Sequence, residues 1–186
     1  MVLSGKAISL VFAKQSHRSI VYEMLTASEV AVMMFDEQYP APSFEAFYED
    51  DHYYTGEPNA RGSYLLIVKN DDIIGAMSYA SYEGTVRFCE LDIWFKSFDY
   101  TGKGLGVEAL QLVIEFVNQT YNIHTFIMRP WIKNTVAIKA YKKCGFNEFK
   151  QTILKAWYSE ADYNVYGEGD YGLEDTVNLM LELKTP

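Results

Sequence analysis

The chain carries the stretch Thr101-Gly102-Lys103-Gly104-Leu105-Gly106 immediately before a segment with helical periodicity. Apolar residues recur at spacings of three and four through residues 107–118, which predicts an amphipathic helix that begins at the glycines. Glycines let the backbone amides of such a turn point toward one spot, and the start of a helix favours a negative charge. The stretch therefore has the form of a phosphate-binding loop, although it matches neither the mononucleotide nor the dinucleotide glycine pattern.

Strands and helices alternate on both sides of this loop. Apolar runs predict strands at residues 7–12, 64–69, 73–82, 86–95, 123–128, 149–157 and 176–184. Helical spacing predicts helices at residues 16–25 with Ser16 as N-cap, 28–35, 107–118, and 135–143 with Gly145 as its end. Residues 36–57 and 158–175 are predicted loops, the first with one helical turn at 44–50, and Asn70-Asp71-Asp72 marks a hairpin turn. This order predicts one domain over residues 1–186, an α/β or α+β sheet with a parallel crossover.

The composition narrows the class of protein. Acidic residues outnumber basic ones by 25 to 16, a formal net charge of −9 that would repel a polyphosphate backbone, so nucleic acid is not expected as a partner. Cys89 and Cys144 have no metal-ligand spacing, which suits a reducing compartment. The three histidines are scattered, so no metal site is expected. No window approaches the roughly 20 apolar residues of a membrane span, so we expect a soluble cytoplasmic protein without membrane contact.

Two carboxylates share one face of the strand predicted at residues 86–95. Side chains alternate along a strand, so Glu90 and Asp92 point the same way, together with Phe88 and Trp94. A carboxylate that faces a cleft can take a proton from a reacting group. Either acid could instead be held in a structural salt bridge, which is the ordinary fate of a single strand carboxylate.

A second motif follows downstream, Asn134-Thr135-Val136-Ala137-Ile138-Lys139-Ala140-Tyr141-Lys142-Lys143-Cys144-Gly145-Phe146. It resembles the Asn-x-x-Ala-Ile-x-x-Tyr-x-x-x-Gly-Phe segment of GNAT acetyltransferases, and the glycine stretch resembles their Gln/Arg-x-x-Gly-x-Gly/Ala pyrophosphate loop. The resemblance implies the GNAT fold. In that fold a mixed, mostly antiparallel sheet has helices on both faces and a parallel crossover splayed at the acetyl-CoA site.

The resemblance also implies acetyl-CoA as co-substrate and a role for each matched position. Backbone amides of the glycine loop would hold the pyrophosphate, the backbone of residues 93–95 would bond the pantetheine arm, and Asn134 would bond the cofactor through its amide. Tyr141 would be the general acid that protonates the leaving thiolate, although such a tyrosine can also be an ordinary half-buried aromatic residue. The implied cofactor contacts are Ile93, Trp94, Phe95, Thr101, Gly102, Lys103, Gly104, Leu105, Gly106, Val107, Asn134, Ala137 and Tyr141.

Within the family, Glu90-Leu91-Asp92-Ile93-Trp94-Phe95 looks most like the aminoglycoside 6'-N-acetyltransferase branch, where an aspartate matching Asp92 contacts the reacting amine. Asp92 is therefore the first choice for the base or amine anchor, and Glu90 the second. Two positions depart from the pattern. Thr101 stands where the family usually has Gln or Arg, and Arg129 stands before Pro130 where the branch often has an aspartate. The first departure removes one side-chain contact to phosphate, and the second puts the acceptor in doubt.

The acceptor is predicted from charge. Residues 36–57 and 158–175 together hold 13 of the 25 acids and no lysine or arginine, and they are expected to wall the acceptor cleft. Such a wall suits a small polycation, an aminoglycoside or a polyamine, whose primary amine would attack acetyl-CoA directly in a ternary complex, although charge runs are usually solvated loops. Acetylation of a protein N-terminus or lysine, and a non-catalytic CoA-binding module, remain the alternatives. Many proteins of the family dimerise, so a homodimer is also expected.

Overall fold

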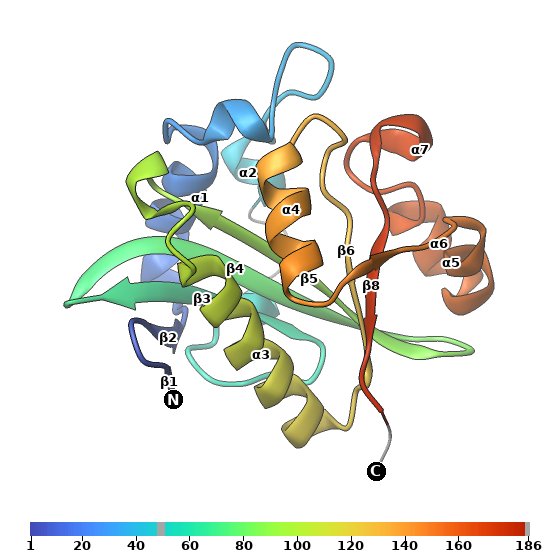
Figure 1. The fold of residues 1–186 in the computed structure, drawn as a ribbon, viewed down its shortest axis with the longest axis horizontal. Coiled ribbons are helices and arrows are strands. Elements are labelled where there is room, and N and C mark those ends of the chain that lie inside the picture. The colour runs from blue at the N-terminus through green and yellow to red at the C-terminus, as the bar shows by residue number, and fades with distance from the viewer. Residues whose placement is uncertain (48–50, 185–186) are drawn as a thin grey trace.

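The computed structural model describes residues 1–47 and 51–184, with the side chains of residues 51 and 52 left out (Figure 1). Its centre is an eight-stranded sheet with the order β1-β2-β3-β4-β5-β6-β8-β7. The strands are β1 (Val2–Ser4), β2 (Ser9–Phe12), β3 (Gly62–Lys69), β4 (Asp72–Glu83), β5 (Arg87–Phe95), β6 (Thr125–Met128), β7 (Asn147–Glu148) and β8 (Leu179–Glu182). Neighbouring strands are antiparallel except β5 and β6, which form the expected parallel crossover.

Helices cover both faces of the sheet, as predicted (Figure 1). One face carries α3 (Leu105–Tyr121) and α4 (Thr135–Lys143). The other carries α1 (Arg18–Thr26), α2 (Phe44–Phe47) and the short 3-10 turns η1 (Gln15–His17), η2 (Ala31–Met33) and η3 (Asp51–Tyr54). The 3-10 turn η4 (Phe98–Tyr100) precedes α3, while α5 (Thr152–Trp157), α6 (Glu160–Tyr166) and α7 (Gly172–Asp175) gather beside β8. No described helix combines the length and apolar composition needed to cross a bilayer.

Strand alternation decides which side chains meet which helices. Leu65 and Leu91 lie in the core that α3 and α4 cover, whereas Leu66 and Trp94 lie in the core that α1 covers. Glu90 and Asp92 have the same parity as Trp94, so their side chains leave the sheet on the α1 side.

The strongest local signals are confirmed. Helix α4 runs from Thr135 to Lys143 as predicted, and Gly145 beyond it has a φ of 96°, a conformation that glycine adopts without strain. The β3–β4 hairpin turns at Asn70 and Asp71, whose φ angles of 49° and 65° match the left-handed turn that such residues favour.

The strand predicted at residues 149–157 is wrong, because Thr152–Trp157 forms helix α5. None of these residues lies in a strand. The two-residue edge strand β7, which pairs with β8, ends just before them at Glu148. The apolar run is buried from this helix instead of from a strand, because Leu154 packs with Phe88 and Ile127 at the end of the sheet. The predicted loop at 158–175 also holds α6, capped by Ser159, whose hydroxyl accepts a hydrogen bond from the Asp162 amide at 3.1 Å, and α7.

The first helical region also differs from the prediction. Ser16 is not an N-cap, because the chain first makes the 3-10 turn η1, in which His17 Nδ1 accepts a hydrogen bond from the Lys14 amide at 3.1 Å. The helix predicted at residues 28–35 is reduced to η2. Of the helical turn predicted at 44–50, α2 forms the described part, and residues 48–50 lie outside the described residues.

Candidate active site

The sheet opens between its two parallel strands. Residue pairing between β5 and β6 runs from Phe88 with Thr125 to Glu90 with Ile127 and ends there, whereas β4 stays paired with β5 as far as Phe95. In the described chain, the rest of β5 therefore has no strand partner on its β6 side. This is the splay that the fold prediction implied, and it leaves the backbone of residues 93–95 beside an open gap.

The glycine loop ends at the start of α3, which begins at Leu105, two residues earlier than predicted. Gly104 is the N-cap residue, with a φ of 82° and no side chain to cap the first amides, and Gly102 has a φ of 69°. A Cβ added at Gly102 or Gly104 would meet no protein atom within 4 Å, so the loop faces open space. The uncapped first-turn amides can thus receive an anion.

The other residues of the loop differ in their exposure and contacts. The Thr101 hydroxyl donates to the Phe98 carbonyl at 2.8 Å, so its side chain is used within the loop. Lys103 is exposed, Leu105 is buried, and Gly106 lies against the Phe95 ring, 3.5 Å from where its Cβ would be.

A smaller cavity of about 80 Å³ lies in the gap, between β5 and α4. It is lined by Met34, Leu91, Asp92, Ile93, Met128, Arg129, Pro130, Trp131, Asn134, Ala137, Tyr141, Asp170 and Tyr171. Asn134 is the N-cap of α4, because its Oδ1 accepts a hydrogen bond from the Ala137 amide at 3.1 Å. Among the described residues, none accepts a hydrogen bond from its amide nitrogen.

Tyr141 projects from α4 and is 7% exposed. Burial, and then the negative charge of Asp92, raise the pKa of its hydroxyl above the ordinary value, so the hydroxyl stays protonated and can act as an acid. Trp94, by contrast, buries its side chain on the opposite face against α1, so only its backbone is near the gap.

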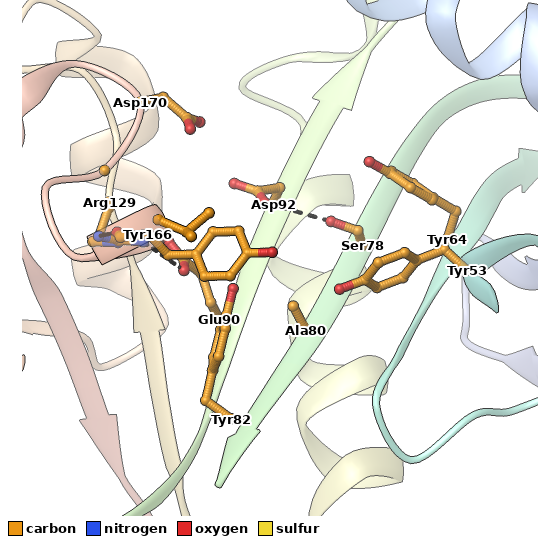
Figure 2. A pocket seen from close by; sticks show the side chains of 12 residues that line it. Tyr53, Tyr64, Ser78, Ala80, Tyr82, Glu90, Asp92, Arg129, Tyr166 and Asp170 are labelled. Atoms are coloured by element: carbon orange, nitrogen blue, oxygen red, sulfur yellow. Dashed lines mark hydrogen bonds and ion pairs between the residues drawn. The ribbon is translucent and has the colours of Figure 1, made fainter. Parts of the chain in front are cut away.

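A larger cavity of about 200 Å³ lies on the α1 side of β4 and β5 (Figure 2). It is lined by Tyr53, Tyr64, Ser78, Ala80, Tyr82, Glu90, Asp92, Arg129, Val165, Tyr166, Gly169 and Asp170. Figure 2 shows the hydroxyls of Tyr53, Tyr82 and Tyr166 turned toward its centre. Both segments expected to wall the cleft contribute, but among their described acids only Asp170 lines it, beside Tyr53, Val165, Tyr166 and Gly169.

Glu90 and Arg129 form a two-pronged ion pair at the edge of this cavity. Arg129 Nε and Nη2 donate to the two Glu90 carboxylate oxygens at 2.6 and 2.7 Å, and the side chains are 6% and 12% exposed for Arg129 and Glu90. Glu90 thus has the structural salt bridge that the sequence left open for either acid. Both of its oxygens are bound by the guanidinium, so Glu90 is poorly placed to act as a base.

Asp92 lines both cavities and remains without an ion-pair partner among the described residues. Its Oδ2 accepts one long hydrogen bond from the Ser78 hydroxyl, at 3.4 Å. Asp92 is exposed through the cavity, and the protein atoms around the carboxylate reduce its hydration. This desolvation, with the negative charges of Glu90 and Asp170, raises the pKa of Asp92 to about 8. Asp92 is therefore the carboxylate that can take up a proton near neutral pH.

Residues 10–147 match the family model described as an acetyltransferase (GNAT) domain. The chain belongs to the GNAT acetyltransferase family. The sequence motifs that resembled this family therefore identified it correctly.

Solved structures of other acetyltransferases share the fold of this GNAT domain at low sequence identity. AAC(6')-Ib, an aminoglycoside acetyltransferase solved with paromomycin and acetyl-CoA, superimposes with a TM-score of 0.67 at 16% identity, over 95% of this chain and 94% of that one. A spermidine N-acetyltransferase from Vibrio cholerae with CoA and spermine gives 0.67 at 15% identity, over 96% of both chains. A ribosomal L7/L12 alpha-N-protein acetyltransferase with coenzyme A gives 0.68 at 17% identity, over 98% of both.

The GNAT site also contains residues that the motifs did not indicate. Asp170 lines both cavities, and Ser78, Tyr64 and Tyr82 come from strands that were predicted only as scaffold. Strand parity could have found Ser78, which pairs directly with Asp92 across β4 and β5. No local signal could have selected Asp170 among the acids of its loop.

Proposed function

We propose that this GNAT domain transfers the acetyl group of acetyl-CoA to a primary amine of a small polycationic acceptor, by direct attack in a ternary complex. One observation carries the proposal. Asp92 stands where two cavities on opposite sides of the open sheet meet, so a donor in one and an acceptor in the other would react beside it.

The α3 and α4 side suits acetyl-CoA. The pyrophosphate would lie on the uncapped amides of residues 102–107, where the positive end of a 17-residue helix favours an anion. The pantetheine arm would run along the unpaired edge of β5 at Ile93–Phe95 and add hydrogen bonds as an extra strand does. The thioester would then reach the smaller cavity, where the Asn134 amide and Ala137 could contact it. Lys103 is exposed on the loop, where its charge could contact a phosphate.

The chemistry then needs one base and one acid. The acceptor ammonium loses a proton to Asp92, the free amine attacks the thioester carbonyl, and a C–N bond forms. When the tetrahedral intermediate collapses, the C–S bond breaks and the CoA sulfur takes the proton of Tyr141. The new amide nitrogen loses its second proton, which returns to the Tyr141 phenolate directly or through solvent. Asp92 releases the first proton to solvent, so both groups end the cycle as they began.

The larger cavity suits a compact cation. Its described ionic groups are Glu90, Asp92, Asp170 and Arg129. Arg129 is already matched by Glu90, so two carboxyl groups remain that can bind a cation. Tyrosine rings around a cation add cation–π attraction. The walls formed by Tyr53 on one side and Tyr166 on the other favour a small acceptor over a protein terminus. The solved structures with similar folds include an aminoglycoside, a spermidine and a ribosomal-protein acetyltransferase. They therefore support acetyl transfer to an amine but do not select one class of acceptor.

The experiment is thiol release from acetyl-CoA with ribostamycin, spermidine and a short peptide as acceptors. We expect turnover with a polycationic amine, and a loss of about 10²- to 10⁴-fold in kcat for Asp92→Asn and for Tyr141→Phe. Glu168→Gln, an exposed acid outside both cavities, is the control and should keep full activity. Turnover of the peptide alone would contradict the acceptor class. Tight binding of acetyl-CoA without turnover of any amine would favour a non-catalytic CoA-binding module.

A further inference from the structure

We propose that Asp170 binds the acceptor ammonium together with Asp92, and that Arg129 is the positioning residue that places it. The inference rests on the proposed function, because it concerns the acceptor half of the same site. It adds a second carboxylate that no motif indicates and gives a role to the unexpected arginine after β6.

Asp170 lies at the junction of the two cavities. It lines both of them, a property shared in the described chain with Asp92 and Arg129. Asp92 reaches the junction from β5 and Asp170 from the turn between α6 and α7, and Figure 2 shows the two carboxylates turned toward the same space. A group that sits between them would be beside the atoms that react.

Asp170 is free to bind a ligand. Within residues 1–47 and 51–184 it accepts no hydrogen bond and forms no ion pair. Other acids of the same region are engaged in the fold, because Asp162 accepts from Ser159 at 2.7 Å and Asp175 accepts from the Tyr39 hydroxyl at 2.8 Å. Asp170 is exposed through the cavity, so its carboxylate is accessible to a cation that enters there. An ammonium group has three N–H donors and can serve both aspartates at once.

The turn that carries Asp170 is built on Arg129. Arg129 Nη1 donates to the Tyr166 carbonyl at 2.6 Å and lies 3.4 Å from the Gly167 carbonyl, which also accepts from Gln151 Nε2 at 2.9 Å. Gly169 has a φ of 73°, and a Cβ there would approach Arg129 Nη1 to 3.4 Å, so the turn fits closely against the guanidinium. Because Glu90 holds the other edge of Arg129, the ion pair fixes the turn relative to β5.

The same ion pair sets the charge of the site. If Glu90 were unpaired, three carboxylates could bind the acceptor cation. Glu90 lines only the larger cavity, so a cation bound to it would lie farther from the proposed thioester position. With Glu90 matched by Arg129, the uncompensated carboxylates are Asp92 and Asp170, and both border the smaller cavity. The acceptor cation is therefore drawn to the place where it can be acetylated.

The test is Asp170→Asn beside Glu168→Gln, which makes the same charge change on the same loop outside both cavities. Binding of spermine and ribostamycin is measured by calorimetry without acetyl-CoA, so that the result does not depend on turnover. We expect Asp170→Asn to weaken binding of at least one of the two about tenfold or more, and to raise KM far more than it lowers kcat. Asp170→Glu should restore part of the affinity, and Glu168→Gln should bind as the wild type does.

A second readout separates binding from structure. Asp92 is faced by Glu90 on β5, Tyr64 on β3, Tyr141 on α4, and Arg129, Asp170 and Tyr171 on the loops. Removing the charge of Asp170 should move the acid limb of kcat/KM to lower pH without lowering the melting temperature. Unchanged affinity in Asp170→Asn overturns the proposal, and so does a wild-type chain that binds neither cation. If the wild type binds a cation that Asp170→Asn loses, yet acetylates no amine, the Asp170 site stands and the proposed enzymatic function falls.

Discussion

Arg129 holds both carboxylate oxygens of Glu90, at 2.6 and 2.7 Å, from a position 39 residues further along the chain. The pair links β5 to the segment after β6 at the point where these parallel strands part. It decides which carboxylate of β5 stays available, and it ties the α6–α7 turn to the sheet through the Tyr166 carbonyl.

Breaking this pair from one side should destabilise the fold strongly. Arg129→Met leaves Glu90 nearly buried without a counter-charge, and we expect a loss of about 3–5 kcal/mol in the free energy of unfolding, measured with urea. Adding Glu90→Gln should recover part of the loss, because the uncompensated charge is gone. Lys142→Met is the control, since its ion pair with Glu148 is exposed, and it should cost less than about 1 kcal/mol. Equal losses in both arginine variants would show that the pair contributes mainly through packing.

The pH dependence of activity should report Asp92. Its pKa is raised to about 8 by desolvation and by Glu90 and Asp170, so the basic form that accepts a proton grows as pH rises through that value. We expect kcat/KM to rise with pH up to about 8 and then to level, as measured by thiol release in constant ionic strength. Asp92→Asn should remove this limb. A limb near pH 4 in the wild type would mean that the carboxylate titrates as if it were in water.

The same shift predicts the opposite trend in stability. An unfolded aspartate has a pKa of about 3.9, so between about pH 4 and 8 the folded chain binds a proton that the unfolded chain has released. Asp92 therefore contributes stability at low pH that is lost as pH rises through its folded pKa. Asp92→Asn should gain melting temperature over the wild type at pH 8.5 and gain less at pH 4.5. The same difference at both pH values would contradict the raised pKa.

Gly104 should be required for acetyl-CoA binding beyond its effect on folding. Its φ of 82° makes alanine strained there, by about 1–2 kcal/mol. Gly172 on α7 has a φ of 67° and, like Gly104, no atom within 4 Å of an added Cβ, so Gly172→Ala is a matched control for strain. We expect similar losses in melting temperature, with KM for acetyl-CoA raised roughly three- to tenfold in Gly104→Ala alone. Equal KM values would place the pyrophosphate elsewhere.

Local signals predicted the elements nearest the proposed cofactor. Helix α4, the hairpin at Asn70 and Asp71, and the glycine loop before α3 are each specified by residues within a few positions of one another, through capping, positive φ and periodicity. Residues 149–157 were misassigned because a short apolar run is compatible with either a buried strand or a helix. Strand β7 ends at Glu148, before this run, and Leu154 is buried from helix α5 instead.

Motif spacing and strand alternation are properties of neighbouring residues, so the family, the glycine loop and the pair of carboxylates on one face of β5 could be predicted from the chain alone. Packing of distant segments settled the rest: Glu90 is paired with Arg129, whereas Asp92 lies at the meeting point of two cavities that Asp170 also lines. Those outcomes depend on distances between side chains that come from β5, the end of β6 and the α6–α7 turn. A carboxylate's pKa and its availability are set by such distances and by exclusion of water, and neither is encoded in local sequence.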